Sequence, residues 1–135
     1  ILVSTIVLNW NVHQLAKSNN ILVAQANPGG MHLYDISNVA SPVFITNYDF
    51  SSDAGGLSPG GILAVGNTLY ATMGQVIGIG TSVARVSLAD PAEPYIMEWL
   101  SLNAQVAGIN RGPFLHNGIL YMANSKYKMV AVDVP

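Results

Sequence analysis

The sequence contains no cysteine. Disulfide bridges, thiolate metal sites, c-type haem attachment and cysteine nucleophiles are therefore excluded. Charged residues are also scarce, at 9% of the chain against about 25% in average soluble proteins. The net charge is −2, and Lys126 and Lys128 are the closest pair of cations. Because duplex binding needs several cations on one face, we expect no nucleic-acid partner.

Long apolar runs and helical patterns are missing as well. The longest apolar run, residues 1–8, is interrupted by Ser4 and Thr5 and is far shorter than the roughly 20 residues of a membrane-spanning helix. We therefore expect no membrane span. Val, Ile, Tyr and Thr dominate the periodic segments, and no window combines a 3.6-residue period with helix caps. These patterns predict an all-β protein.

A short phrase recurs three times, as a turn pair followed by an apolar strand. Its copies, at residues 19–24, 66–71 and 117–122, place Leu22, Leu69 and Leu120 at equivalent positions, roughly 50 residues apart. A second phrase at residues 33–42 returns at 85–94, and its opening returns at 131–134. Repeats of this length built from short strands predict propeller blades, which bury their faces only when copies stack.

Turn signals and two-residue alternation divide each repeat into four strands. The pairs Asn19-Asn20, Gly66-Asn67 and Asn117-Gly118 are typical of tight β-hairpins, because these residues tolerate positive φ. The expected strands are 12–18, 20–26, 30–37, 42–50, 61–66, 68–73, 80–88, 94–101, 113–117, 119–124 and 127–134, with a further strand at 1–8.

The sequence thus predicts a single segment, residues 1–135, of a β-propeller with four-stranded antiparallel blades, about three of them in this segment. Residues 1–8 would end a preceding blade, 9–50 and 51–101 would form two blades, and 102–135 would form an incomplete one. Since both ends cut through the repeat, we expect an excerpt of a longer protein, the alternative being a complete mature chain. A β-solenoid or sandwich with a coincidental spacing is the alternative fold.

Three stretches resemble the LVIVD-repeat β-propeller family: His13-Gln14-Leu15-Ala16, residues 33–37 and residues 90–94. The resemblance spans nearly the whole chain. It departs from the family pattern at Ser87, where the family has Asp, and at Asn38-Val39, which replaces Asp-Pro. It implies a propeller of the kind found mostly in secreted or surface-exposed bacterial and archaeal proteins, generally without an assigned reaction. Together with the low charge, it predicts a secreted or cell-surface location.

The segment Gly56-Leu57-Ser58-Pro59-Gly60 satisfies the G-x-S-x-G pattern of hydrolase nucleophiles. Such an elbow needs a helix after the serine and the N–H of the next residue for its oxyanion hole. Pro59 has no N–H, and a strand is expected to follow. The segment is therefore interpreted as a loop between blades, and no catalytic residue is predicted.

The three histidines, His13, His32 and His116, fall at three different positions of the repeat. They do not form a ring of equivalent ligands, so we predict no metal site and no cofactor. Asp35 and Asp133 stand at the starts of turns, where a carboxylate accepts backbone N–H groups. Tyr70 and Tyr121 occupy one repeat position, which favours packing between blades.

One polar patch is predicted at the mouth of the propeller channel. His13 and Arg111 share a repeat position near the start of an inner strand, and with Asn110 and Asp53 they could hold an anion or a polar ligand. The alternative is that His13 and Arg111 hydrogen-bond to carbonyl groups of neighbouring blades.

Two functions therefore remain open. The first is a non-enzymatic propeller scaffold or an interaction and adhesion module with a protein or glycan partner. The second is a propeller enzyme or ligand-binding protein with a metal or cofactor site at the channel mouth. In either case three blades cannot close a ring, since propellers use about 4 to 8 blades. We expect further blades of the same polypeptide, or a second copy of the chain, to cover the end faces.

Overall fold

The computed structural model describes residues 1–27, 30–50, 59–76, 80–102, 110–126 and 128–134. Within these ranges the chain forms strands and turns and no helix, which confirms the all-β prediction. The strands are β1 (Asn11–Ser18), β2 (Ile21–Asn27), β3 (Gly30–Asp35), β4 (Val43–Tyr48), β5 (Gly61–Val65), β6 (Thr68–Val76), β7 (Gly80–Ser87), β8 (Tyr95–Ser101), β9 (Asn110–His116), β10 (Ile119–Asn124) and β11 (Lys128–Asp133).

These strands form three antiparallel sheets in sequence order. Sheet 1 has the order β1-β2-β3-β4, sheet 2 the order β5-β6-β7-β8, and sheet 3 the order β9-β10-β11. Each strand pairs with the next one along the chain within its sheet. The predicted division into two four-stranded units and a shorter third unit is confirmed at the level of the sheets.

Tight hairpins join the first two strands of every sheet, as the turn pairs predict. Asn19, Gly66 and Asn117, the first residue of each pair, have φ values of 51°, 56° and 50°. Asn and Gly tolerate this left-handed conformation better than other residues, which is why they recur at these turns.

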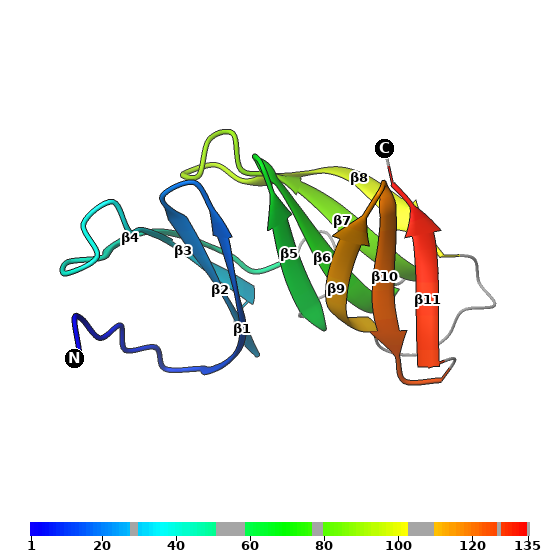
Figure 1. The fold of residues 1–135 in the computed structure, drawn as a ribbon, viewed down its shortest axis with the longest axis horizontal. Coiled ribbons are helices and arrows are strands. Elements are labelled where there is room, and N and C mark those ends of the chain that lie inside the picture. Colours follow the sequence, from blue (N-terminus) through cyan, green and yellow to red (C-terminus); the bar gives the residue numbers. More distant parts are fainter. Residues whose placement is uncertain (28–29, 51–58, 77–79, 103–109, 127, 135) are drawn as a thin grey trace.

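The three sheets stand side by side, with their first strands next to one another (Figure 1). Strand β5 packs against β1 on one side and against β9 on the other. Two apolar cores fill the interfaces. Core 1, between sheets 1 and 2, contains Val23, Met31, Leu33, Phe50, Ile62, Leu69, Ala71, Met73, Ala84, Val86 and Leu88. Core 2, between sheets 2 and 3, contains Tyr70, Val83, Leu102, Leu120, Met122 and Val134.

Hydrogen bonds between sheets 1 and 2 follow the repeat. The Ser18 hydroxyl donates to the Gly66 carbonyl at 2.5 Å, and Asn19 Nδ2 donates to Asn67 Oδ1 at 3.1 Å. Gln14 Oε1 accepts the Ile62 N–H at 3.0 Å. The partners are 48 residues apart in each of these bonds, so sheets 1 and 2 are joined through nearly equivalent positions.

The strand predicted at residues 1–8 does not form. These residues pair with no sheet, although the structure describes all of them. The connection to β1 is also too short for residues 1–8 to end a preceding sheet in the way that β4 and β8 end theirs. Residues 49–60 connect the outermost strand β4 to β5, and residues 102–109 connect the outermost strand β8 to β9. By contrast, only Asn9 and Trp10 separate residue 8 from β1. Two residues span about 7 Å, half the width of a four-stranded sheet, since its strands lie about 4.8 Å apart.

Two strands are longer than predicted because the ladders contain bulges. Strand β9 begins at Asn110 rather than at 113, and its register against β10 shifts across Gly112 and Pro113. A bulge tolerates proline because the extra residue needs no ladder hydrogen bond. Strand β6 likewise continues to Val76 past a register shift at Gly74.

Candidate functional site

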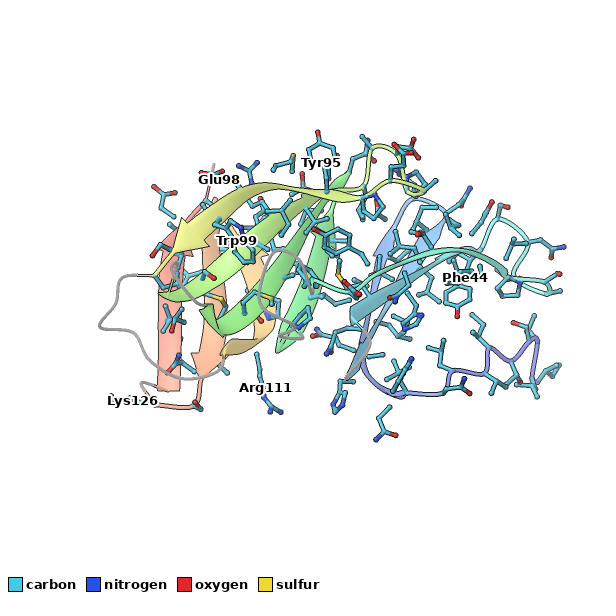
Figure 2. The ribbon with its side chains drawn as sticks, turned by 180° about the vertical axis from the view of Figure 1, so that it is seen from behind. Phe44, Tyr95, Glu98, Trp99, Arg111 and Lys126 are labelled. Atoms are coloured by element: carbon cyan, nitrogen blue, oxygen red, sulfur yellow. The ribbon has the colours of Figure 1, made fainter. Side chains whose placement is uncertain are left out.

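Two residues of the predicted polar patch, His13 and Arg111, lie at the end of the first strands that is opposite to their hairpins. His13 is the unpaired residue of a bulge in β1, because Val12 pairs with Ala26 and Gln14 with Gln25. Arg111 pairs with Ala123 directly before the bulge in β9. Both side chains are exposed, and Figure 2 shows Arg111 pointing away from the sheets.

Strand β5 separates the two side chains, since it packs between β1 and β9. The three first strands approach one another closely at Gly61. A Cβ atom added there would lie 2.9 Å from Gln14 Oε1 and 2.8 Å from both the Gly112 nitrogen and Pro113 Cδ. Among the described residues, neither His13 nor Arg111 makes a hydrogen bond or an ion pair with a side chain. An imidazole and a guanidinium group are therefore presented separately to solvent at the same end of the molecule.

The side chains of the other two members of the patch, Asn110 and Asp53, lie outside the described part of the structure. Asn110 begins β9, but the structure describes only its backbone. Asp53 lies outside the described residues, as does Ser58 of the G-x-S-x-G segment. Pro59, the residue after that serine, is buried, and its carbonyl accepts a hydrogen bond from Gln25 Nε2 at 2.8 Å. Pro59 thus connects the chain before β5 to sheet 1.

The other two histidines lie in unrelated surroundings. His32, on β3, is buried beside Phe44, with their ring centroids 6.5 Å apart. Burial lowers the pKa of His32, because an apolar environment disfavours the imidazolium form. Its buried Nε2 has no hydrogen-bond partner among the described residues. His116, on β9, is exposed beside Asn117. In the part of the chain that the structure describes, no three potential metal ligands gather.

The predicted turn role of Asp35 is confirmed. Its Oδ1 accepts the Ser37 N–H at 2.7 Å, and this bond lowers the pKa of the carboxyl. Ser87, the equivalent residue of the next repeat, accepts the Ala89 N–H in the same way at 3.3 Å. The packing role of Tyr70 is also confirmed, since it is buried in core 2. Its equivalent Tyr121 is only half-buried.

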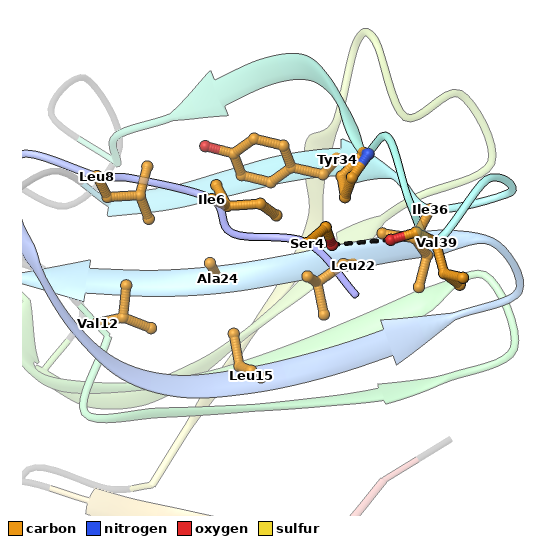
Figure 3. A pocket seen from close by; sticks show the side chains of 11 residues that line it. Ser4, Ile6, Leu8, Val12, Leu15, Leu22, Ala24, Tyr34, Ile36 and Val39 are labelled. Carbon is orange, nitrogen blue, oxygen red and sulfur yellow. Dashed lines mark hydrogen bonds between the residues drawn. The ribbon is translucent and has the colours of Figure 1, made fainter. Parts of the chain in front are cut away.

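The sequence did not predict an apolar cavity on the outer face of sheet 1. Residues 1–8, called the N-terminal segment below, lie across this face, with the Ser4 hydroxyl donating to the Val39 carbonyl at 2.8 Å (Figure 3). The cavity has a volume of about 380 Å³. Ile6 and Leu8 line it from the segment, and Leu22, Ala24 and Tyr34 line it from the sheet. The two-residue alternation of the segment could have indicated this packing, because every second residue, Ser4, Ile6 and Leu8, faces the sheet.

No described helix is long and apolar enough to cross a membrane. No model of a known protein family matches the chain, and no curated protein matches it either. Among solved structures, the computationally designed Ika4 protein is similar, with a TM-score of 0.53 and 10% sequence identity. The similarity covers 100% of this chain and 99% of the designed chain. At this identity it concerns the fold alone.

Proposed function

We propose that this chain is part of a β-propeller that serves as a non-enzymatic scaffold or interaction module. The observation that carries the proposal is the repeated stacking of equivalent sheets. Leu69 of sheet 2 lies in core 1 and its equivalent Leu120 of sheet 3 lies in core 2, so successive sheets present the same face to the sheet before them.

The propeller arrangement is supported by the first strands. In a propeller, the first strand of each blade lies innermost, beside the first strands of its neighbours. The packing of β5 between β1 and β9 fits such a centre. The resemblance to LVIVD-repeat propellers agrees with this arrangement, and so do the bulges at Ile45 and Met97, which recur at equivalent places in the fourth strands of sheets 1 and 2.

A scaffold role on the outside of a cell agrees with the low proportion of charged residues and with the resemblance. The partners that we propose are a protein or a glycan bound at the surface, and further sheets of the same kind, from the same polypeptide or from a second copy, at the end faces. An electron-microscopy or crystal structure of the assembled protein tests the arrangement. It should show the sheets radiating from an axis, with β1, β5 and β9 innermost.

Metal analysis and native mass spectrometry of the purified protein test the scaffold role. We expect neither a stoichiometric metal nor a small molecule bound to the chain. A stoichiometric metal would contradict the scaffold role and favour an enzyme or a ligand-binding protein.

The alternative function is binding of an anion or a polar ligand at the channel mouth. It is favoured by the exposure of His13 and Arg111 at the same end of β1 and β9. Titration with small carboxylates and phosphates should then give an affinity that both His13→Ala and Arg111→Ala weaken. Lys17→Ala, which removes an exposed cation near the other end of β1, is the matched control.

A further inference from the structure

Sheet 3 ends in an apolar face that no described element covers. This leading face comprises Phe114, Tyr121, Ala123 and Met129. Phe114 and Met129 are 62% and 66% exposed, and all four residues line a shallow hollow. Their equivalents in sheet 2 are Leu63, Tyr70, Thr72 and Val83, and three of these pack in or against core 2. The leading face thus repeats, at equivalent positions, the surface by which sheet 2 binds sheet 3.

Sheet 1 ends in the complementary surface, called the trailing face here, which comprises Leu15, Leu22, Ala24, Tyr34, Ile36 and Phe44. The equivalents of these residues in sheet 2 are Ile62, Leu69, Ala71, Val86, Leu88 and Ile96. All six pack in or against core 1. The trailing face therefore corresponds to the surface by which sheet 2 binds sheet 1.

Each chain consequently carries both halves of an interface that it already forms twice within itself. A surface that fits a different surface of the same molecule gives a head-to-tail contact between copies, which closes into a ring when the rotation permits. The surroundings of Gly112 show that sheet 3 has room for a neighbouring sheet. A Cβ atom at Gly61 would meet atoms of both adjacent sheets, whereas one at the equivalent Gly112 would meet nothing within 4 Å.

The N-terminal segment covers much of the trailing face. It rests on Leu22 and Ala24, whose equivalents Leu69 and Ala71 pack against a neighbouring sheet. The segment forms no strand ladder. Several of its outward side chains are apolar and exposed to solvent, with Val3 60% and Val7 83% exposed. It thus occupies the place of a neighbouring sheet without making the ladder bonds that would fix it there.

We propose that the leading face of one copy binds the trailing face of a second copy, and that the N-terminal segment competes for the trailing face. This inference rests on the proposed stack of equivalent sheets but not on the scaffold role. A folded chain that remains monomeric would overturn self-docking alone, whereas a structure without radial sheets would overturn the propeller.

The first test is sedimentation equilibrium of the full chain over a range of concentrations. Ile6→Ser/Leu8→Ser should free the trailing face and tighten self-association at least tenfold. Val3→Ser/Val7→Ser, in the same segment but on its outward side, is the matched control and should leave the affinity unchanged. Equal affinities for the two double variants would overturn the competition, and a monomer at every concentration would overturn the docking.

A second test identifies the faces. Phe114→Asp, on the leading face, should abolish self-association. Tyr95→Asp is the control, because Tyr95 is also an exposed aromatic residue, at 59%, but lies on the outermost strand of sheet 2. Self-association that survives Phe114→Asp would contradict the proposed interface. Circular dichroism and cooperative unfolding establish that each variant is folded.

A cysteine trap tests the orientation and does not depend on these substitutions. The contact between Asn19 and Asn67 joins the hairpins of sheets 1 and 2, and its equivalent between copies joins Asn117 of one chain to Asn20 of the other. Since the chain has no cysteine of its own, Asn20→Cys/Asn117→Cys should form a reducible covalent dimer under mild oxidation. Each single-cysteine variant is the control. Cross-linking of a single variant as efficient as that of the pair would indicate a different geometry and overturn the head-to-tail contact.

Discussion

Strands β6 and β10 occupy equivalent places in sheets 2 and 3, yet they differ in burial. Every side chain from Leu69 to Met73 in β6 is buried. In β10, Tyr121 is half-buried and Ala123 exposed, although their neighbours Leu120, Met122 and Asn124 are buried. The two strands read Leu-Tyr-Ala-Thr-Met and Leu-Tyr-Met-Ala-Asn, so composition does not explain the contrast. A sheet in the middle of a stack is covered on both faces and an end sheet on one, and place in the stack therefore decides burial.

The largest effect is expected from the equivalent leucines. Leu69→Ala and Leu120→Ala each empty a fully buried position and should lower the free energy of unfolding by about 2–5 kcal/mol. Leu22→Ala removes the equivalent side chain from the end face of sheet 1, where it is half-buried, and should cost less than half as much. Urea denaturation measures all three. A similar cost at Leu22 would mean that this face is as well covered as the internal interfaces.

A smaller difference is expected at the equivalent glycines. Gly61→Ala would press a methyl group against the backbone of Gly112 and should destabilise the fold by about 1–3 kcal/mol. Gly112→Ala meets open space and costs only the strain of a φ of 56°, about 1 kcal/mol. The shift in the midpoint of thermal unfolding compares the two. If Gly112→Ala proved the more harmful, its neighbours would have to lie closer than the structure places them.

The smallest effect concerns pH. Burial holds the pKa of His32 below its usual 6.5, so the unfolded chain binds this proton more tightly than the folded chain. The stability should therefore be complete above about pH 6.5 and decline as the pH falls below it. Asp35 does not interfere in this window, because its own pKa is lowered below 3.8 and it stays ionised.

Chemical denaturation at about pH 7.5 and pH 5 measures this decline. His32→Ala is the matched variant, because the equivalent residue of sheet 2 is the buried Ala84. It should show a weaker pH dependence than the parent chain. If His32→Ala showed the same pH dependence of stability as the parent chain, other titratable groups would be responsible for it.

Much of the fold follows from local sequence. The hairpin pairs carry positive φ, and the apolar alternation places every strand of the three sheets within a few residues. These features depend on residues close together in the sequence, so a short stretch of sequence is enough to predict them. Residues 1–8 have the same alternation but form no strand, and they lie across the outer face of sheet 1 instead of pairing with an edge.

The candidate site was harder to predict. The sequence placed His13 and Arg111 near the start of first strands, and the structure agrees. The bulge that leaves His13 unpaired and the bulge that follows Arg111 have no clear local signal. Apolar end faces were expected, because repeats of this kind bury their faces only where copies stack. Their residues became visible only when the register of the strands showed which side chains share a face.

The constant step of 48 residues between hydrogen-bonded partners of sheets 1 and 2 bears on how the chain folds. The entropy lost in bringing two sheets together depends on the loop closed between them, and that loop has the length of one repeat. Each further sheet would close a loop of the same length, so the entropy lost for each added sheet would stay the same. Folding should therefore start at any adjacent pair of sheets and spread outward, with a rate that depends on the repeat more than on the number of repeats.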